Sequence, residues 1–274
     1  MTINCKGTLI DLSTPKVMGI LNITPDSFYD GGHYKNNASI LNQVEKMLSE
    51  GATFIDLGAY SSRPGANHVS ETEELNRIIP IVELLVAKFP DINLSIDTFR
   101  SNIAKKCIGA GAAMVNDISA GQLDSTMLET VGKLNVPYIM MHMKGTPQTM
   151  QQFTDYEDLI KDIIYYFSER ITEARSHKIN DIIIDPGFGF SKTLEQNYKL
   201  LNNLKLLNII GLPILVGVSR KSMIYKLLNN SPNKALNGTT SLNTIALLRG
   251  AKILRVHDVK EAMECVKLTN QLNS

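Results

Sequence analysis

Short apolar runs alternate along this chain with longer segments whose apolar positions repeat every three or four residues. The clearest apolar run covers residues 181–185, where three consecutive isoleucines predict a strand buried on both faces. The clearest helical pattern covers residues 156–176, with Ile160, Ile163 and Phe167 on one stripe. The pattern predicts eight strands, at residues 17–22, 53–58, 93–97, 114–118, 137–142, 181–185, 213–219 and 252–257.

Helical segments separate these strands, so strand and helix alternate strictly. This alternation predicts parallel strands with right-handed crossovers, and eight such units match the size of a (β/α)8 TIM barrel. The alternative is an open doubly wound sheet, which usually has a glycine-rich turn after its first strand, whereas residues 22–25 read Asn-Ile-Thr-Pro. We therefore expect one α/β domain over residues 1–274, a TIM barrel with a short N-terminal hairpin at residues 3–14. The predicted helices cover residues 38–50, 71–88, 125–134, 156–176, 193–208, 221–229, 239–249 and 259–271, and a further helix contains Ile103, Ala104, Cys107 and Ile108.

Charge and cysteine content narrow the class of protein. The net charge of +1 gives no field for steering nucleic acid. Cys5, Cys107 and Cys265 are far apart and odd in number, so they fit neither a disulfide framework nor a zinc site. The first residues lack the layout of a signal peptide, and no apolar run approaches the roughly 20 residues of a membrane helix. We expect a cytoplasmic protein that binds small molecules, with no nucleic-acid or membrane partner.

A polar side chain marks the carboxyl end of each predicted strand. Asp185 is the clearest case, because a carboxylate at the end of an apolar strand is costly to desolvate without a partner or a function. The alternative is that Asp185 caps the local Asp-Pro turn. TIM barrels carry their active sites at these strand ends. The polar groups there are Asn22, Asp56, Asp97, Asn116, His142, Asp185, Lys221, Arg255 and His257.

Three of these groups suit the edge of a flat heterocycle. Asp97, Asn116 and Asp185 together offer hydrogen-bond acceptors and one amide donor. A carboxylate can accept a bidentate pair from adjacent N–H and NH₂ groups, which is the edge that a pterin or a guanine-like ring presents. Phe188 and Phe190 could wall or stack on such a ring, although core packing explains them equally well.

Five cationic side chains suggest an anion site. Arg255 and His257 are two residues apart on one strand, so they point to the same face, and Arg63, Arg220 and Lys221 join them. The alternative is a solvated arginine beside a structural histidine. Lys221 could bind an anion, hold a carbonyl oxygen or act as a Schiff-base nucleophile; without its place at a strand end it would be an ordinary surface lysine.

Two long loops follow the first two barrel strands. The first covers residues 24–33 and carries Asp30; the second covers residues 59–69 and carries Arg63, which Pro64 holds in an extended form. Loops of this length over a barrel mouth commonly close as lids. Disordered loops are the alternative.

Several of these segments resemble the signature motifs of dihydropteroate synthases, in order and over residues 15–265. The resemblance implies a TIM barrel, usually dimeric, that joins p-aminobenzoate to 6-hydroxymethyl-7,8-dihydropterin pyrophosphate, with Mg²⁺, and releases pyrophosphate. It thus implies a transferase of folate biosynthesis, and the target of sulfonamide drugs. The matching segments are residues 19–28 (Gly-Ile-Leu-Asn-Ile-Thr-Pro-Asp-Ser-Phe), 62–65 (Ser-Arg-Pro-Gly), 185–190 (Asp-Pro-Gly-Phe-Gly-Phe), 217–222 (Gly-Val-Ser-Arg-Lys-Ser) and 255–259 (Arg-Val-His-Asp-Val).

The resemblance also implies which residues bind the two substrates. Asp97, Asn116 and Asp185 would hold the pterin ring, with Lys221 on the side of its carbonyl oxygen. The p-aminobenzoate side, where sulfonamides compete in this family, would be lined by Ser62, Phe190, Lys221 and Ser222.

The remaining implied roles concern the leaving group and the reacting carbon. Asn22 would meet the metal or the pyrophosphate, and Arg63, Arg255 and His257 would meet the pyrophosphate. Asp30 would stabilise the cationic carbon or the incoming amine. Departure of pyrophosphate leaves positive charge that the pterin ring can share, so electrostatic help for the leaving group matters more than a strong base. The expected catalytic residues are Asp30, Arg63 and Lys221.

One segment departs from the family pattern. The family commonly reads Gly-Glu-Ser-Thr-Arg-Pro-Gly in the second loop, and residues 59–65 read Ala-Tyr-Ser-Ser-Arg-Pro-Gly. Ser62 keeps the hydroxyl. Because the glutamate is missing, the sequence does not indicate how the loop closes.

Three other functions remain possible from the sequence. A pterin-binding methyltransferase on the same barrel would use the acids without the anion site, an aldolase would form a Schiff base on Lys221, and a paralogue could bind pterin without catalysis.

Overall fold

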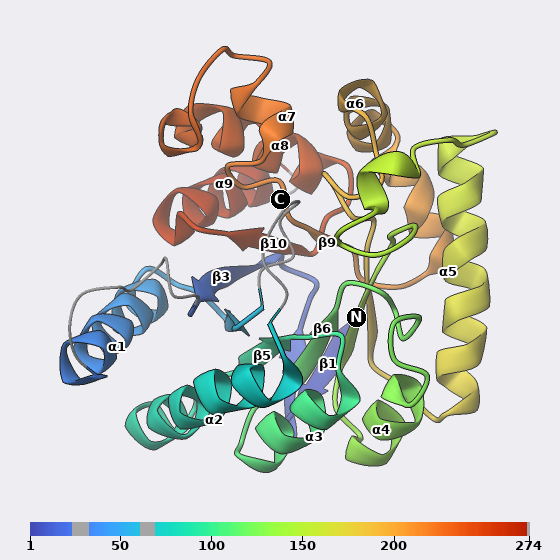
Figure 1. Ribbon diagram of the computed structural model, residues 1–274. Coiled ribbons are helices and arrows are strands. Elements are labelled where there is room, and N and C mark those ends of the chain that lie inside the picture. The colour runs from blue at the N-terminus through green and yellow to red at the C-terminus, as the bar shows by residue number, and fades with distance from the viewer. Residues whose placement is uncertain (24–32, 61–68, 273–274) are drawn as a thin grey trace.

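The computed structural model describes residues 1–23, 33–60 and 69–272, and its eight parallel strands confirm the TIM barrel (Figure 1). These strands are β3 (Lys16–Asn22), β4 (Phe54–Gly58), β5 (Leu94–Asp97), β6 (Met114–Asp117), β7 (Tyr138–Met141), β8 (Ile182–Asp185), β9 (Leu215–Val216) and β10 (Ile253–Val256). They are hydrogen-bonded in the order β8-β7-β6-β5-β4-β3-β10-β9. An isolated parallel bridge between Ile184 and Ile214 then brings the two ends of the sheet together.

An antiparallel hairpin lies at the amino-terminal end of the barrel, as expected. Its strands, β1 (Thr2–Cys5) and β2 (Thr8–Asp11), are joined by Lys6 and Gly7. Both joining residues have positive φ, +52° and +85°, as tight two-residue hairpin turns require. Residues Ile3, Cys5 and Leu12 are buried against a layer of side chains inside the barrel, which includes Met18, Phe54, Met114, Ile139, Ile183, Leu215 and Ile253. The hairpin therefore plugs this end of the barrel with apolar surface.

Helices cover the outside of the strands (Figure 1). They are α1 (His33–Ser49), α2 (Glu71–Lys88), α3 (Ser101–Gly109), α4 (Met127–Leu134), α5 (Leu159–Ser176), α6 (Leu194–Asn202), α7 (Ser222–Tyr225), α8 (Leu236–Leu248) and α9 (Val259–Leu272), with short 3₁₀ helices at Met150–Gln152, Leu204–Ile210 and Pro232–Lys234. No described helix has both the length and the apolarity needed to cross a membrane.

Some element boundaries differ from those that the sequence predicts. The helix expected over 193–208 ends at Asn202, because the side chain of Asn203 turns back to donate to Lys199 O over 2.8 Å and a 3₁₀ helix follows. The strand expected over 213–219 keeps only two ladder residues, Leu215 and Val216. At its start, Pro213 has no N–H to donate, and Ile214 pairs through an isolated bridge. The first helix begins at His33, earlier than residue 38.

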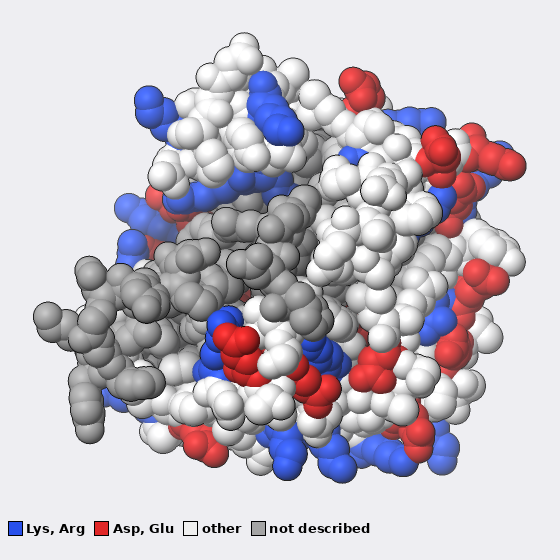
Figure 2. All heavy atoms as spheres, in the orientation of Figure 1, with Lys and Arg blue, Asp and Glu red and all other residues white. Residues whose placement is uncertain are grey.

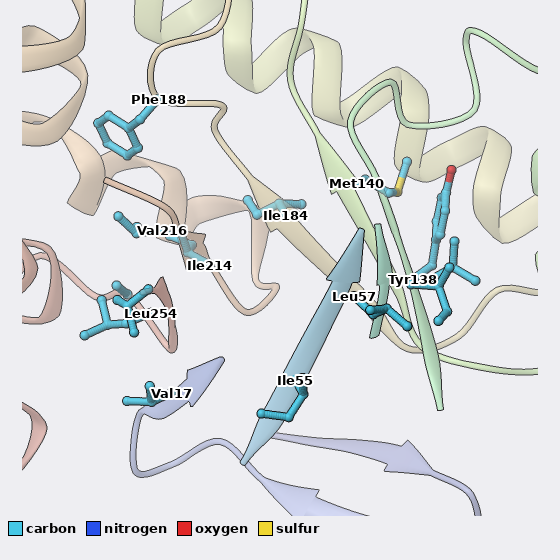
Figure 3. Packing of buried hydrophobic residues seen from close by; sticks show 14 of the residues in the cluster. Val17, Ile55, Leu57, Tyr138, Met140, Ile184, Phe188, Ile214, Val216 and Leu254 are labelled. Carbon is cyan, nitrogen blue, oxygen red and sulfur yellow. The ribbon is translucent and has the colours of Figure 1, made fainter. Parts of the chain in front are cut away.

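Side chains alternate along each strand between the barrel interior and the helical layer. Val17, Ile55, Ile184 and Leu254 belong to the large core between strands and helices (Figure 3), while their sequence neighbours belong to the interior layer. This is the period of two that the pleat of a strand imposes. On the face shown in Figure 2, charged side chains of both signs are interspersed, in keeping with the net charge of +1.

Candidate active site at the mouth of the barrel

Strand periodicity brings the polar strand-end residues into the barrel interior. On β4, β5, β6, β8 and β10, the residue two positions beyond the interior layer, on the same face of the strand, is polar. Asp56, Asn116, Asp185 and Arg255 follow the apolar residues Phe54, Met114, Ile183 and Ile253. Asp97 takes the same place on β5, where the residue two positions earlier is the buried Ser95. The sequence expectation that acids and amides share one mouth therefore has a geometric basis.

Arg255 connects two acids across this mouth. Its Nε donates to Asp56 Oδ2 over 2.5 Å, and its Nη2 donates to Asp97 Oδ2 over 2.8 Å. Asn116 Nδ2 donates to the same Asp56 oxygen over 3.0 Å. Asp56 is fully buried, and its Oδ1 has no hydrogen-bond partner in the described part of the chain. The arginine expected to meet pyrophosphate is thus held in place by carboxylates.

Burial controls the ionisation of the two acids expected to hold a pterin. Burial raises the pKa of Asp97 to about 7; Arg255 opposes this shift, and the nearby carboxylate of Asp56 adds to it. Burial also raises the pKa of Asp185, which Lys221 opposes. Asp185 Oδ1 accepts a hydrogen bond from Gly187 N over 2.8 Å, so its other oxygen is available to a ligand. Both acids would be more readily ionised with a donor-rich ligand in place.

Lys221 lies between the acids and an aromatic ring. Its ammonium donates to the carbonyl of Phe188 and stands 4.9 Å from the centre of the Phe190 ring. Burial lowers the pKa of Lys221 to about 8, although Asp185 opposes the shift. Phe188 is fully buried in the core, whereas Phe190 is half-buried. Core packing thus explains Phe188, and Phe190 remains the candidate wall of the site.

The remaining described candidates lie at the rim. Asn22 and Asp97 both lie next to Gly58. A Cβ built on this glycine would be 3.6 Å from Asn22 Oδ1 and 3.5 Å from Asp97 Cβ. His257 Nδ1 lies 3.0 Å from Ser219 Oγ. Ser222 is exposed at the start of α7. Asn22, His257 and Ser222 therefore border the cluster at its open side.

Arg220 does not extend the cationic cluster. Its Nη2 and Nε donate to the two carboxylate oxygens of Asp258 over 2.6 Å and 3.0 Å. Its backbone adopts a left-handed φ of +53°, with its N–H donating to Thr239 Oγ1 over 3.1 Å. These bonds fix the residue that immediately precedes Lys221.

Three expected site residues lie outside the described part of the chain: Asp30 in the first loop, and Ser62 and Arg63 in the second. Their roles stay predictions.

His142 is a strand-end residue that does not join the mouth. It follows Met141, which is in step with the interior face, so its ring points outward and meets Tyr166 edge-on, with centroids 4.8 Å apart. Its Nδ1 lies 3.0 Å from Nζ of Lys192, a lysine that is only 4% exposed. Sequence reasoning missed Lys192, because lysines are normally exposed and no pattern marks this one as buried.

The turn after β8 tolerates no side chain at Gly187. Its φ is +72°, and a Cβ there would lie 2.1 Å from the carbonyl oxygen of His142. We expect Gly187→Ala to lower the free energy of unfolding by about 2 kcal/mol or more, since strain and a backbone clash combine. Gly211→Ala is a matched control, because Gly211 has a φ of +75° with open space around it. Equal losses in urea unfolding of the two variants would contradict the clash.

Comparison with known proteins agrees with this geometry. The model of the pterin binding enzyme family matches residues 18–257. Dihydropteroate synthase of Escherichia coli strain K12 is 42% identical over 270 residues, which cover 98% of this chain and 95% of that protein. The chain belongs to the dihydropteroate synthase family. The dihydropteroate synthase of Haemophilus influenzae is 43% identical over 98% of both chains.

Solved dihydropteroate synthases share the whole fold. The Yersinia pestis enzyme in complex with a sulfonamide drug superposes with a TM-score of 0.93 at 44% identity, covering 100% of this chain and 99% of that one. The Xanthomonas albilineans enzyme with 4-aminobenzoic acid gives a TM-score of 0.92 at 36% identity, covering 100% and 98%.

In this dihydropteroate synthase family member, Tyr60 occupies the position of the commonly found glutamate. The guanidinium of Arg100 lies 5.3 Å from the centre of the Tyr60 ring, and its Nη2 donates to Val69 O over 2.7 Å. Glu74, fully buried, supplies the opposing charge. Gln148 Nε2 donates to Tyr60 OH over 3.0 Å. Arg100 therefore connects the residues that flank the second loop on both sides.

Proposed function

We propose that this chain condenses 6-hydroxymethyl-7,8-dihydropterin pyrophosphate with p-aminobenzoate to give 7,8-dihydropteroate and pyrophosphate. The observation that carries the proposal is the convergence of Asp97, Asn116, Asp185 and Lys221 at one barrel mouth, in a chain 42–45% identical to bacterial dihydropteroate synthases. Residues 1–274 act as one pterin-binding domain.

Asp97, Asn116 and Asp185 bind the pterin ring in this proposal. The buried carboxylate of Asp185 and the partly buried carboxylate of Asp97 accept from the ring N–H and NH₂ groups, and each charge-assisted bond is about twice as strong as a neutral one. Lys221 donates to the ring carbonyl oxygen. Its pKa is lowered to about 8, so the ammonium form is still dominant at pH 7. The charges of Asp185 and Asp97 favour this form.

Pyrophosphate and its metal lie on the open side. Arg63, Arg255 and His257 bind the leaving anion, and Arg255 reaches it by relaxing its bond to Asp97 once that acid engages the pterin. Mg²⁺ suits Asn22, because this metal takes oxygen ligands and usually only one or two from the protein when phosphates supply the others. Among the described residues no cluster of three or more His, Cys, Asp or Glu side chains could hold a metal. The metal would offset charge on the leaving group.

The residues that act on the reacting groups are Asp30, Arg63 and Lys221. As the C–O bond to pyrophosphate breaks, the ring carries positive charge, which Asp30 stabilises, while Arg63 stabilises the departing oxygen. The neutral aniline nitrogen of p-aminobenzoate then attacks the methylene carbon and loses its proton to water. Ser62, Phe190, Lys221 and Ser222 position that amine, on the side where sulfonamide drugs would compete.

Pyrophosphate release that depends on added p-aminobenzoate tests the proposal. A coupled assay for pyrophosphate, with the pterin pyrophosphate supplied, should give signal only when the amine is present. Release independent of the amine, or none at all, would overturn the assignment.

Pterin binding should weaken at acid pH. The pKa of Asp97 is raised to about 7, so below this pH the free protein carries the neutral acid, which cannot accept from both ring donors. Affinity for 6-hydroxymethyl-7,8-dihydropterin should fall by about tenfold per pH unit below pH 6. Calorimetry from pH 5 to 8, in two buffers that differ in ionisation enthalpy, should also detect proton release near neutral pH. An affinity independent of pH would argue against an acceptor role for Asp97.

We further propose a cytoplasmic homodimer. All three cysteines are buried and unbridged, which suits a reducing compartment. On the packed pair α8 and α9, Ile245, Leu248, Leu268 and Leu272 are between 40% and 72% exposed. Sedimentation at micromolar concentration should give twice the 30.3 kDa chain mass, and Leu248→Lys with Leu268→Lys should give monomers. A monomeric wild-type protein would refute the dimer.

A further inference from the structure

Lys192 is a buried lysine beneath the turn that follows β8. Its Nζ lies 3.0 Å from each of three acceptors: His142 Nδ1, Gly187 O and Phe190 O. An ammonium has three N–H donors and no acceptor, so the three partners match it one for one. Leaving any of them unpaired at this depth would cost about 1–3 kcal/mol.

Two of the three acceptors, Gly187 O and Phe190 O, belong to a turn that carries site residues at both ends. Asp185 precedes the turn and Phe190 closes it, and the carbonyl of Phe188 between them accepts from the ammonium of Lys221. The turn is held from its other side by Asn197, whose Oδ1 accepts from Gly189 N over 2.7 Å. Lys192 therefore fixes the two carbonyls that flank Phe188.

The histidine partner is suited to accept. Burial and the positive charges of Lys192 and Lys144 lower the pKa of His142 well below its usual value, so its Nδ1 can accept from the ammonium. Burial also lowers the pKa of Lys192 to about 7, with Asp185 opposing the shift, so the ammonium form with three donors prevails below neutral pH. The tyrosine rings of Tyr156 and Tyr166 enclose the histidine.

We propose that Lys192 is a positioning residue: it holds the Gly187 and Phe190 carbonyls so that Phe188 O and the Phe190 ring keep Lys221 in place for p-aminobenzoate. The consequence for catalysis rests on the proposed function. The consequence for Lys221 does not, because it concerns contacts within the protein. Loss of the ammonium should let the turn move, and a displacement of about 1 Å can cost up to 100-fold in rate.

The kinetic test is Lys192→Met, which keeps an unbranched side chain, one atom shorter, and removes its donors. We expect the KM for p-aminobenzoate to rise by about tenfold or more, with the affinity for 6-hydroxymethyl-7,8-dihydropterin changed less than about threefold, since Gly187 N still holds Asp185. Lys144→Met is the matched control. Its Nζ donates to Asp155 O over 2.7 Å and stacks over Tyr156, close to the same histidine, without contacting the turn. Equal losses for both substrates, or an unchanged KM, would overturn the proposal.

A second measurement needs no substrate. The titration of Lys221, followed by NMR of ¹³C-labelled lysine, should move between wild type and Lys192→Met, because Lys221 loses its fixed carbonyl partner; an unchanged titration would overturn the assignment. If Lys192→Met does not fold, Lys192→Gln serves in both tests. Wild-type protein that releases no pyrophosphate would refute the proposed function alone, and the NMR result would still decide the role of Lys192.

Discussion

Asp185→Asn is expected to lower the affinity for 6-hydroxymethyl-7,8-dihydropterin by about 100-fold or more. The turn after β8 should survive, because an asparagine Oδ1 can still accept from Gly187 N as the aspartate does over 2.8 Å. That arrangement leaves the new NH₂ group facing the ring donors. One charge-assisted hydrogen bond is lost, worth about 1.5–3 kcal/mol, and two donors meet without an acceptor.

Asp181→Asn is the control for this substitution. Asp181 lies just before the same strand, and its Oδ2 accepts from Asn4 N over 2.9 Å, at the plugged end of the barrel. Calorimetric titration should show wild-type affinity for this variant. Near-normal pterin affinity of Asp185→Asn would remove the central support for pterin binding at this mouth.

Arg255→Ala is expected to lower the free energy of unfolding by about 3–5 kcal/mol, as well as to abolish pyrophosphate binding. Arg255 supplies the charge that opposes Asp56 and Asp97, and Asp56 is fully buried. Removing one partner of a buried ion pair leaves an uncompensated charge, which is the costly case. The loss should shrink at acid pH, where Asp97, whose pKa burial raises, takes up a proton.

Arg249→Ala serves as control for this variant, since in the described part of the chain the guanidinium of Arg249 makes a single, exposed hydrogen bond, to Asn202 Oδ1 over 3.2 Å. Urea unfolding should show a loss below about 1 kcal/mol for it. Asp56→Asn added to Arg255→Ala should recover part of the stability while pyrophosphate binding stays lost. A destabilisation of Arg255→Ala as small as that of the control would contradict the proposed charge balance.

The sequence predicted the barrel and its polar mouth because both depend on a local period of two. Residues such as Asp56, Asn116 and Arg255 inherit their direction from the apolar residue two positions earlier. His142 shows the limit of this reasoning. It ends a strand like the others, but it is one position out of step, and its ring points away from the mouth.

Other features depend on contacts between distant segments, which the sequence pattern does not record. The burial of Lys192 requires His142 and the turn after β8 to converge on it. Arg220 pairs with Asp258, 38 positions further along the chain. The sequence had placed Arg220 in the expected anion site, and this ion pair removes it from that site. The roles of Asp30, Ser62 and Arg63 remain predictions from the family resemblance.

The apolar plug formed by β1 and β2 has a kinetic consequence. Among the described residues, the hairpin seals one end of the barrel, so a ligand would reach Asp97 and Asp185 from the opposite end. The ligand that sits deepest must therefore arrive first, and a second ligand seated above it covers its exit. Ligands of such a site are expected to bind in a fixed order, the deepest first, and to leave in the reverse order.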